Sequence, residues 1–138
     1  MSTADNSIPS LPRQIAIAAD HGGFVLKNAV VEHLRGAGYE VTDFGVQSAD
    51  SVDYPDYAEL VSSAVLSGEA DAGILACTTG IGMCIAANRH AGIQASLVGD
   101  VETAAITRQH NESNVLCLAG KTTSVEEAKA IVDCWLTT

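Results

Sequence analysis

The sequence has 138 residues, of which 47% are hydrophobic and 17% are charged. Seven Lys and Arg against 17 Asp and Glu give a formal net charge of −10. This balance argues against nucleic-acid binding, because phosphate contacts along a polyanion need clustered cations. The length suits one compact domain and is hardly enough for two. We therefore expect a single domain over residues 14–138 and a disordered N-terminal tail over residues 1–13.

The opening stretch "MSTADNSIPSLPRQ" resembles neither a signal peptide nor a transit peptide, and no apolar run approaches the thickness of a bilayer. The cysteines form no CxxC pair and stand at Cys77, Cys84, Cys117 and Cys134. Most of them lie in or beside apolar runs, as reduced interior thiols do. These features predict a cytoplasmic protein with no membrane partner, no structural zinc and no disulfide framework.

The predicted elements alternate between strand and helix along the chain. The strands are expected at residues 14–19, a short apolar run, and at 40–45, 72–76, 92–98 and 114–119. The helices, marked by helical spacing of apolar residues or by start signals, are expected at residues 26–37, 55–67, 80–89, 100–109 and 125–136. The last helix begins with the spacing of a capping box between Ser124 and Glu127.

Five repeats of strand and helix with short connections predict right-handed crossovers, and hence a parallel five-stranded sheet with helices on both faces. We therefore expect a doubly wound α/β domain. Ligands bind such sheets beyond the carboxyl ends of the strands. This rule places three stretches along one edge, "DHGG" (20–23), "DFG" (43–45) and "CTTGIG" (77–82).

The stretch "CTTGIG" follows a strand and opens a helix. Its glycines let the backbone approach a ligand, and the first N–H groups of the helix point toward an anion or a developing oxyanion. A helix N-terminus also stabilises a thiolate, so Cys77 is a candidate base. The alternative interpretation is a strand-to-helix turn with a buried cysteine, and the stretch alone leaves the two about equal.

Two other loops carry groups suited to acid–base chemistry. Asp20 and His21 are either catalytic and binding groups or a helix N-cap followed by a solvated histidine. His110 and Asn111 are either turn formers or polar contacts. Together with Cys77 they favour an acid–base site, on the expectation that all three loops share one edge. Structural roles are expected for His33, His90, Met83 and Trp135.

Four blocks then carry a family resemblance: "IAIAADHGGFVLKNAVVEHLRGAGYEVTDFG", "DYPDYA", "ILACTTGIGMCIAANR" with "GIQASL", and "RQHNESNVLCLAG". In this order they resemble the ribose-5-phosphate isomerase B family, which includes the galactose-6-phosphate isomerase subunits, over about residues 14–136. The resemblance implies a Rossmann-like, three-layer α/β/α fold. It also implies interconversion of an aldose phosphate and a ketose phosphate with neither a metal nor an organic cofactor.

Such a reaction moves a proton between C1 and C2 through an enediolate, so it needs a base and donors around the oxyanion. By resemblance, Cys77 is the base and Thr79 helps hold the reacting oxygens. Asp20 and His110 correspond to residues that open the sugar ring and handle its hydroxyl protons. Substrate contacts are implied for His21, Tyr54, Thr78, Gly80, Ile81, Gly82, Asn111 and Lys121. The resemblance further implies a homodimer or tetramer in which His110 reaches the site of a partner subunit.

The sequence departs from the family pattern at two places. Thr78 stands where relatives usually have glycine, so its side chain is expected to crowd the site or to alter which sugar fits. Relatives also carry phosphate-binding arginines beyond the last helix, whereas this sequence ends at Thr138 and offers Lys121, a point charge. The phosphate is then held by His21, Lys121 and backbone, or a partner completes the site, or the sugar is different or unphosphorylated.

Ribose 5-phosphate is the expected substrate. Another aldose phosphate, such as galactose or allose 6-phosphate or a tetrose phosphate, remains an alternative. A catalytically silent subunit that binds a sugar phosphate is the alternative from another functional class.

Overall fold

The computed structural model describes residues 12–47 and 53–138. Its strands are β1 (Gln14–Ala19), β2 (Glu40–Asp43), β3 (Ala72–Cys77), β4 (Ala95–Leu97) and β5 (Val115–Ala119). Its helices are α1 (Phe24–Gly36), α2 (Tyr54–Ser67), α3 (Ile81–Asn88), α4 (Val101–Asn111) and α5 (Val125–Thr137). The tail expected over residues 1–13 lies outside the described residues except for its last two positions.

The strands form one parallel sheet in the order β2-β1-β3-β5-β4. All six residues of β3 are buried, because this central strand has a neighbour on either side and helices on both faces. The predicted doubly wound α/β sheet is therefore confirmed.

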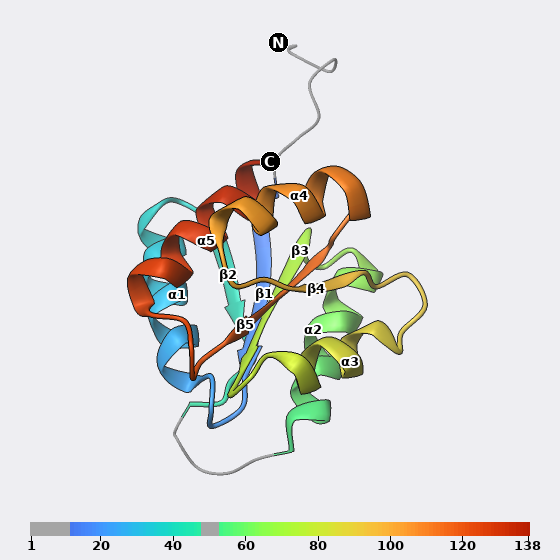
Figure 1. The fold of residues 1–138 in the computed structure, drawn as a ribbon. Helices are drawn as coiled ribbons and strands as arrows, with labels where there is room; N and C mark the ends of the chain where they lie inside the picture. The colour runs from blue at the N-terminus through green and yellow to red at the C-terminus, as the bar shows by residue number, and fades with distance from the viewer. Residues whose placement is uncertain (1–11, 48–52) are drawn as a thin grey trace.

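The helices divide into two layers (Figure 1). α1, α4 and α5 pack on one face of the sheet, around large buried side chains such as Leu34 and Trp135. α2 and α3 pack on the other face, where Leu75 and Met83 lie in the core. Within the described residues, no helix is long and apolar enough to cross a membrane.

Local signals fix where several helices begin and end. Asp100 accepts a hydrogen bond from the backbone N–H of Thr103, which begins α4. The capping box between Ser124 and Glu127 is confirmed at the start of α5. Gly68, in the left-handed conformation with φ 85°, ends α2.

β4 is shorter than the expected strand over residues 92–98. Two asparagine side chains take up backbone groups around it: Asn114 accepts from the N–H of Gln94, and Asn88 accepts from the N–H of Ala95. Asn114 also donates to the carbonyl of Gly92. Side-chain amides thus replace part of the strand ladder, and only three residues remain in regular pairing.

Candidate active site at the carboxyl edge of the sheet

The loops that follow β3 and β5 are joined at the carboxyl edge of the sheet, which is the edge where the strands end. The N–H of Gly120 donates to the carbonyl of Cys77 at 2.8 Å, and the N–H of Lys121 donates to the carbonyl of Thr78 at 2.9 Å. The loop after β1 joins them, since the N–H of Asp20 donates to the carbonyl of Ala76, the residue before Cys77. The edge thus brings three loops into one surface.

Glycines allow these loops to approach so closely. A Cβ on Gly22 would overlap the hydroxyl oxygen of Thr78 and lie 2.8 Å from its backbone nitrogen. A Cβ on Gly23 would overlap the carbonyl of Ala76, and a Cβ on Gly120 would overlap the carbonyl oxygen of Gly22. The glycines of "DHGG" are therefore required by backbone contact between loops.

Cys77 is the last residue of β3 and is 5% exposed. Its sulfur accepts a hydrogen bond from the backbone N–H of Gly80 at 3.2 Å. Gly80 adopts φ 77° immediately before α3, and a Cβ there would overlap the side chain of Leu97. The thiol therefore lies at the base of the edge, against a main-chain donor at the beginning of α3.

The loop itself already uses the backbone N–H groups of Gly80 and Ile81, two residues for which the resemblance implied substrate contacts. Gly80 donates to the sulfur of Cys77, and Ile81 donates to the hydroxyl of Thr79 at 3.3 Å. Thr79 is exposed at the edge. A substrate oxygen would reach the Thr79 hydroxyl directly, whereas it would compete with a protein acceptor for the N–H groups of Gly80 and Ile81.

Asp20 is almost fully buried, at 5% exposed, while His21 beside it is exposed. The carboxylate accepts a hydrogen bond from the N–H of Gly22 at 2.8 Å. The N-cap of α1 is Gly23, which has no side-chain cap. The interpretation of Asp20 as a helix cap is therefore wrong, and its carboxylate closes a short turn at the edge instead.

The first residue of α2 reaches the same edge. A Cβ on Gly82 would lie 2.9 Å from two carbons of the Tyr54 ring, so the ring packs against the backbone of the "CTTGIG" loop. The ring stays partly open to solvent, since Tyr54 is 39% exposed. Tyr54 thus lies where a substrate at this edge would meet it.

His110 and Asn111 lie elsewhere. They form the C-terminal end of α4, which returns along the sheet and ends at the opposite edge from Cys77 (Figure 1). The expectation that three loops share one edge is wrong for this pair, because a helix between two parallel strands ends where the next strand begins. Within one chain, this edge therefore gathers Asp20, His21, Tyr54, Lys121 and the loop that begins at Cys77. The imidazole of His110 is not among these groups.

A buried network holds the loop that follows His110. Arg108 stacks on the ring of Trp135, 4.9 Å from its centroid, and donates to the carbonyl of Ser113 at 2.8 Å. The indole N–H of Trp135 donates to the hydroxyl of Ser113. Desolvation lowers the pKa of the half-buried Arg108 guanidinium. These contacts fix the position of the His110 loop at the end of α4.

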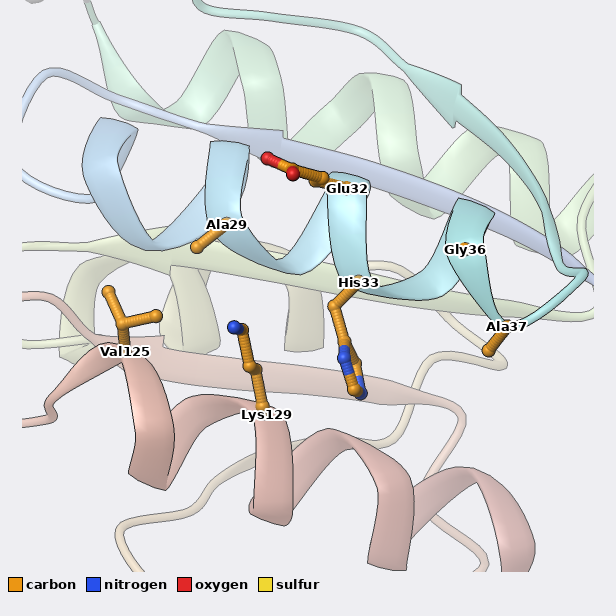
Figure 2. Close-up of a pocket in the computed structure, with 7 residues that line it drawn as sticks. All are labelled: Ala29, Glu32, His33, Gly36, Ala37, Val125 and Lys129. Atoms are coloured by element: carbon orange, nitrogen blue, oxygen red, sulfur yellow. The ribbon is translucent and has the colours of Figure 1, made fainter.

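A groove between α1 and α5 lies apart from this site (Figure 2). Its lining residues are Ala29, Glu32, His33, Gly36, Ala37, Val125 and Lys129. Figure 2 shows His33 pointing toward α5 and Lys129 toward α1. His33 pairs with Asp133 at 2.8 Å, which joins the two helices and agrees with its expected structural role.

Sequence reasoning missed two features close to the site. Lys27 is fully buried and pairs with Asp43 at 2.8 Å, and Asp43 also accepts from the N–H of Gly45. The pair ties the beginning of α1 to the loop after β2. The sequence signal for this buried pair was a lysine within the largely apolar stretch "FVLKNAVV".

The second missed feature is a cluster of thiols. Cys77 and Cys117 lie in the core beneath α2 and α3, and Cys84 of α3 packs against the same core. A hydrogen bond from Cys117 lowers the pKa of Cys84 to about 7. The pKa of Cys117 is raised well above its ordinary value by this bond and by burial. Strand alternation predicts that Cys77 and Cys117 share a face, but the position of Cys84 needs the packing of α3.

No group of three or more His, Cys, Asp or Glu side chains within residues 12–47 and 53–138 is arranged to hold a metal ion. The side chains placed at the edge supply a thiol, a carboxylate, an imidazole, an ammonium group and hydroxyls, beside main-chain donors.

The fold and this edge define a doubly wound α/β domain with an acid–base site beyond its strand ends. Residues 15–138 match the family model described as Ribose/Galactose Isomerase. Ribose-5-phosphate isomerase B of Escherichia coli is 48% identical over 124 residues, covering 90% of this chain and 83% of its own length.

Solved structures agree with that match. A ribose 5-phosphate isomerase of Thermotoga maritima aligns with a TM-score of 0.90 and 51% identity, over 91% of this chain and 86% of its own. Ribose-5-phosphate isomerase B of Mycoplasma genitalium, solved with bound ribulose-5-phosphate, aligns with a TM-score of 0.86 and 43% identity, over 91% and 84%. The chain belongs to the ribose/galactose isomerase family.

Proposed function

We infer that the protein is an aldose–ketose isomerase that converts ribose 5-phosphate to ribulose 5-phosphate. The observation that carries this function is the position of Cys77, held by a main-chain N–H at the carboxyl edge and followed by the exposed Thr79. The relatives support it through their names, and the Mycoplasma genitalium structure holds the ketose product itself.

The residues at the edge suit the steps of such a reaction. The Cys77 thiolate takes the proton from C2 of the open-chain aldose and returns it to C1, so no net proton is consumed. The hydroxyl of Thr79 donates to the oxyanion of the enediolate. The buried Asp20 carboxylate accepts the proton of the C1 hydroxyl as the bond between C1 and the ring oxygen breaks, and this proton passes to the ring oxygen, so ring opening also consumes no net proton. His21 and Lys121, both exposed at the same edge, contact the phosphate.

We propose that the working unit is at least a homodimer, with each site completed by His110 and Asn111 of the partner subunit. The proposal is supported by the distance between the two edges of the sheet, which separates His110 from Cys77 within one chain. Exposed apolar side chains beside the Cys77 loop also support it. Ile81 and Ile85 of α3 are 52% and 53% exposed, and Leu97, beside Gly80, is 41% exposed.

We further propose that the protein works in the cytoplasm. Cys77, Cys84, Cys117 and Cys134 are all free. Unpaired thiols, one of them proposed as a catalytic base, are suited to a reducing compartment.

The deciding experiment is an isomerase assay on chelator-treated protein with ribose 5-phosphate in D₂O. Formation of ribulose 5-phosphate, together with deuterium entering the sugar at the transferred position, supports the function. Binding of the sugar phosphate without any exchange of its C2 proton would instead identify a silent binding subunit. Turnover of unphosphorylated ribose in preference to ribose 5-phosphate would overturn the assignment of the substrate.

A further inference from the structure

Thr78 is the residue between the proposed base and Thr79, and its side chain lies over the loop that follows β1. A Cβ on Gly22 would overlap the Thr78 hydroxyl and lie 2.9 Å from its Cβ. The carbonyl of Thr78 accepts from the N–H of Lys121. Thr78 is thus fixed between the loop that carries His21 and the loop that carries Lys121, and it remains exposed.

The side chain occupies a defined place relative to the substrate. Its carbonyl accepts from the N–H of Lys121, and its hydroxyl is turned toward Gly22, which places the side chain over the loop that follows β1. Because Thr78 follows Cys77 and contacts both loops, a sugar phosphate that reaches from Cys77 to His21 and Lys121 would lie beside its exposed side chain. A side chain at such a place acts through its volume, because a substrate that is one carbon longer has to displace it or bend around it.

We propose that Thr78 is a specificity-determining residue, a wall that restricts the site to sugar phosphates of five carbons or fewer. The inference rests on the proposed isomerase function and names its substrate class. Gly22 is the second member of the pair, because only a residue without a Cβ leaves room for the Thr78 side chain. Thr78 and Gly22 therefore act together, and a change at one alters the effect of a change at the other.

The test compares kcat/KM for allose 6-phosphate and ribose 5-phosphate in the wild type, Thr78→Gly and Thr78→Val. Removing the side chain is expected to raise the ratio of allose to ribose activity about 10-fold or more, the effect of one carbon in a fitted pocket. Valine keeps the volume and loses the hydroxyl, so the ratio should stay near the wild-type value. An unchanged ratio in Thr78→Gly overturns the inference, and so does an equal rise in Thr78→Val, which would assign selectivity to the hydroxyl.

A second measurement tests the pair. Gly22→Ala is expected to lower kcat/KM for ribose 5-phosphate, because the added methyl pushes Thr78 into the path of the sugar. The same change in a Thr78→Gly background should cost less, although its Cβ still meets the backbone nitrogen at 2.8 Å. Equal losses in both backgrounds overturn the coupling. A wild-type protein that is inactive on both sugars would overturn the proposed function, and this inference with it. An active enzyme whose activity ratio is unchanged in Thr78→Gly would overturn this inference alone.

Discussion

The backbone N–H of Gly80 donates to the sulfur of Cys77 over 3.2 Å, which holds the thiol at the junction of β3 and α3. Gly80 adopts the left-handed conformation immediately after this N–H, where the chain turns into α3. A sulfur held by one backbone donor is oriented before any substrate arrives, and orientation of the reacting group is a large part of catalysis.

Cys77→Ala is therefore expected to lower kcat for ribose 5-phosphate by about 10²- to 10⁴-fold, the usual contribution of a positioned base. Stopped assays and C2 proton exchange measure the loss, and circular dichroism checks the fold. Cys84→Ala is the matched control, because it removes a thiol from the same cluster without touching the edge. Turnover of Cys77→Ala within threefold of the wild type would exclude Cys77 as the base.

The proposed sharing of each site between two subunits predicts complementation. Cys77→Ala and His110→Ala are each expected to be nearly inactive alone. After the two proteins are unfolded and refolded together, random pairing gives about half mixed dimers, each with one complete site, and hence about one quarter of wild-type activity. Recovery of activity by mixing is the measurement. No recovery, with mixed dimers demonstrated by native mass spectrometry, would show that His110 serves the site of its own chain or none.

The Lys27–Asp43 pair is expected to be important for stability. The Lys27 side chain is fully buried and that of Asp43 is 15% exposed. Asp43→Ala leaves a buried charge unpaired and should reduce the free energy of unfolding by about 3–5 kcal/mol. Lys27→Met removes the charge, keeps most of the packing and should cost less. Urea denaturation measures both losses of stability. A larger loss for Lys27→Met than for Asp43→Ala would contradict this account.

Glu126→Gln provides the control for that comparison. Glu126 is 3.7 Å from Lys129 in an exposed pair, with side chains 86% and 33% exposed. The loss of such a surface pair should change stability by less than about 1 kcal/mol.

The thiol cluster predicts a pH-dependent reactivity at Cys84. Because its pKa is lowered to about 7, Cys84 should be mostly thiolate above pH 7 and mostly thiol below it. Alkylation by iodoacetamide, followed by mass spectrometry, should reach half its maximal rate near pH 7. Cys117, whose pKa is raised, should stay unreactive while the protein is folded. In Cys117→Ala the hydrogen bond is lost, so the midpoint for Cys84 should move upward, and an unmoved midpoint would contradict the stated cause.

The order of the elements was predictable from sequence because β1, β3 and β5 are short apolar runs, and segments with helical spacing or start signals alternate with the strands. The beginning of β4 was not predictable, since Asn114 and Asn88 bond to Gln94 and Ala95 only once distant segments have packed together. The capping box at Ser124 was predictable because both partners lie within one helical turn.

The site was predicted less completely than the fold. Asp20, Cys77 and Thr79 meet at one edge because each lies at or just after the end of a strand, which the pattern of elements already implied. Placing His110 at that edge contradicted the same pattern, because His110 precedes a strand. The contact between Gly22 and Thr78 depends on backbone approach between loops, and spacing along the chain carries no signal for it.

The sheet order has a consequence for synthesis of the protein. β5 lies between β3 and β4, although it is the last strand to be made. On the ribosome, β4 emerges without a strand to pair with and must wait until residues 115–119 have left the exit tunnel. A nascent chain halted before Val115 would hold β2, β1 and β3 on one side and β4 on the other, with no strand to join them. The late insertion of β5 is therefore the step at which this protein becomes a cooperative unit.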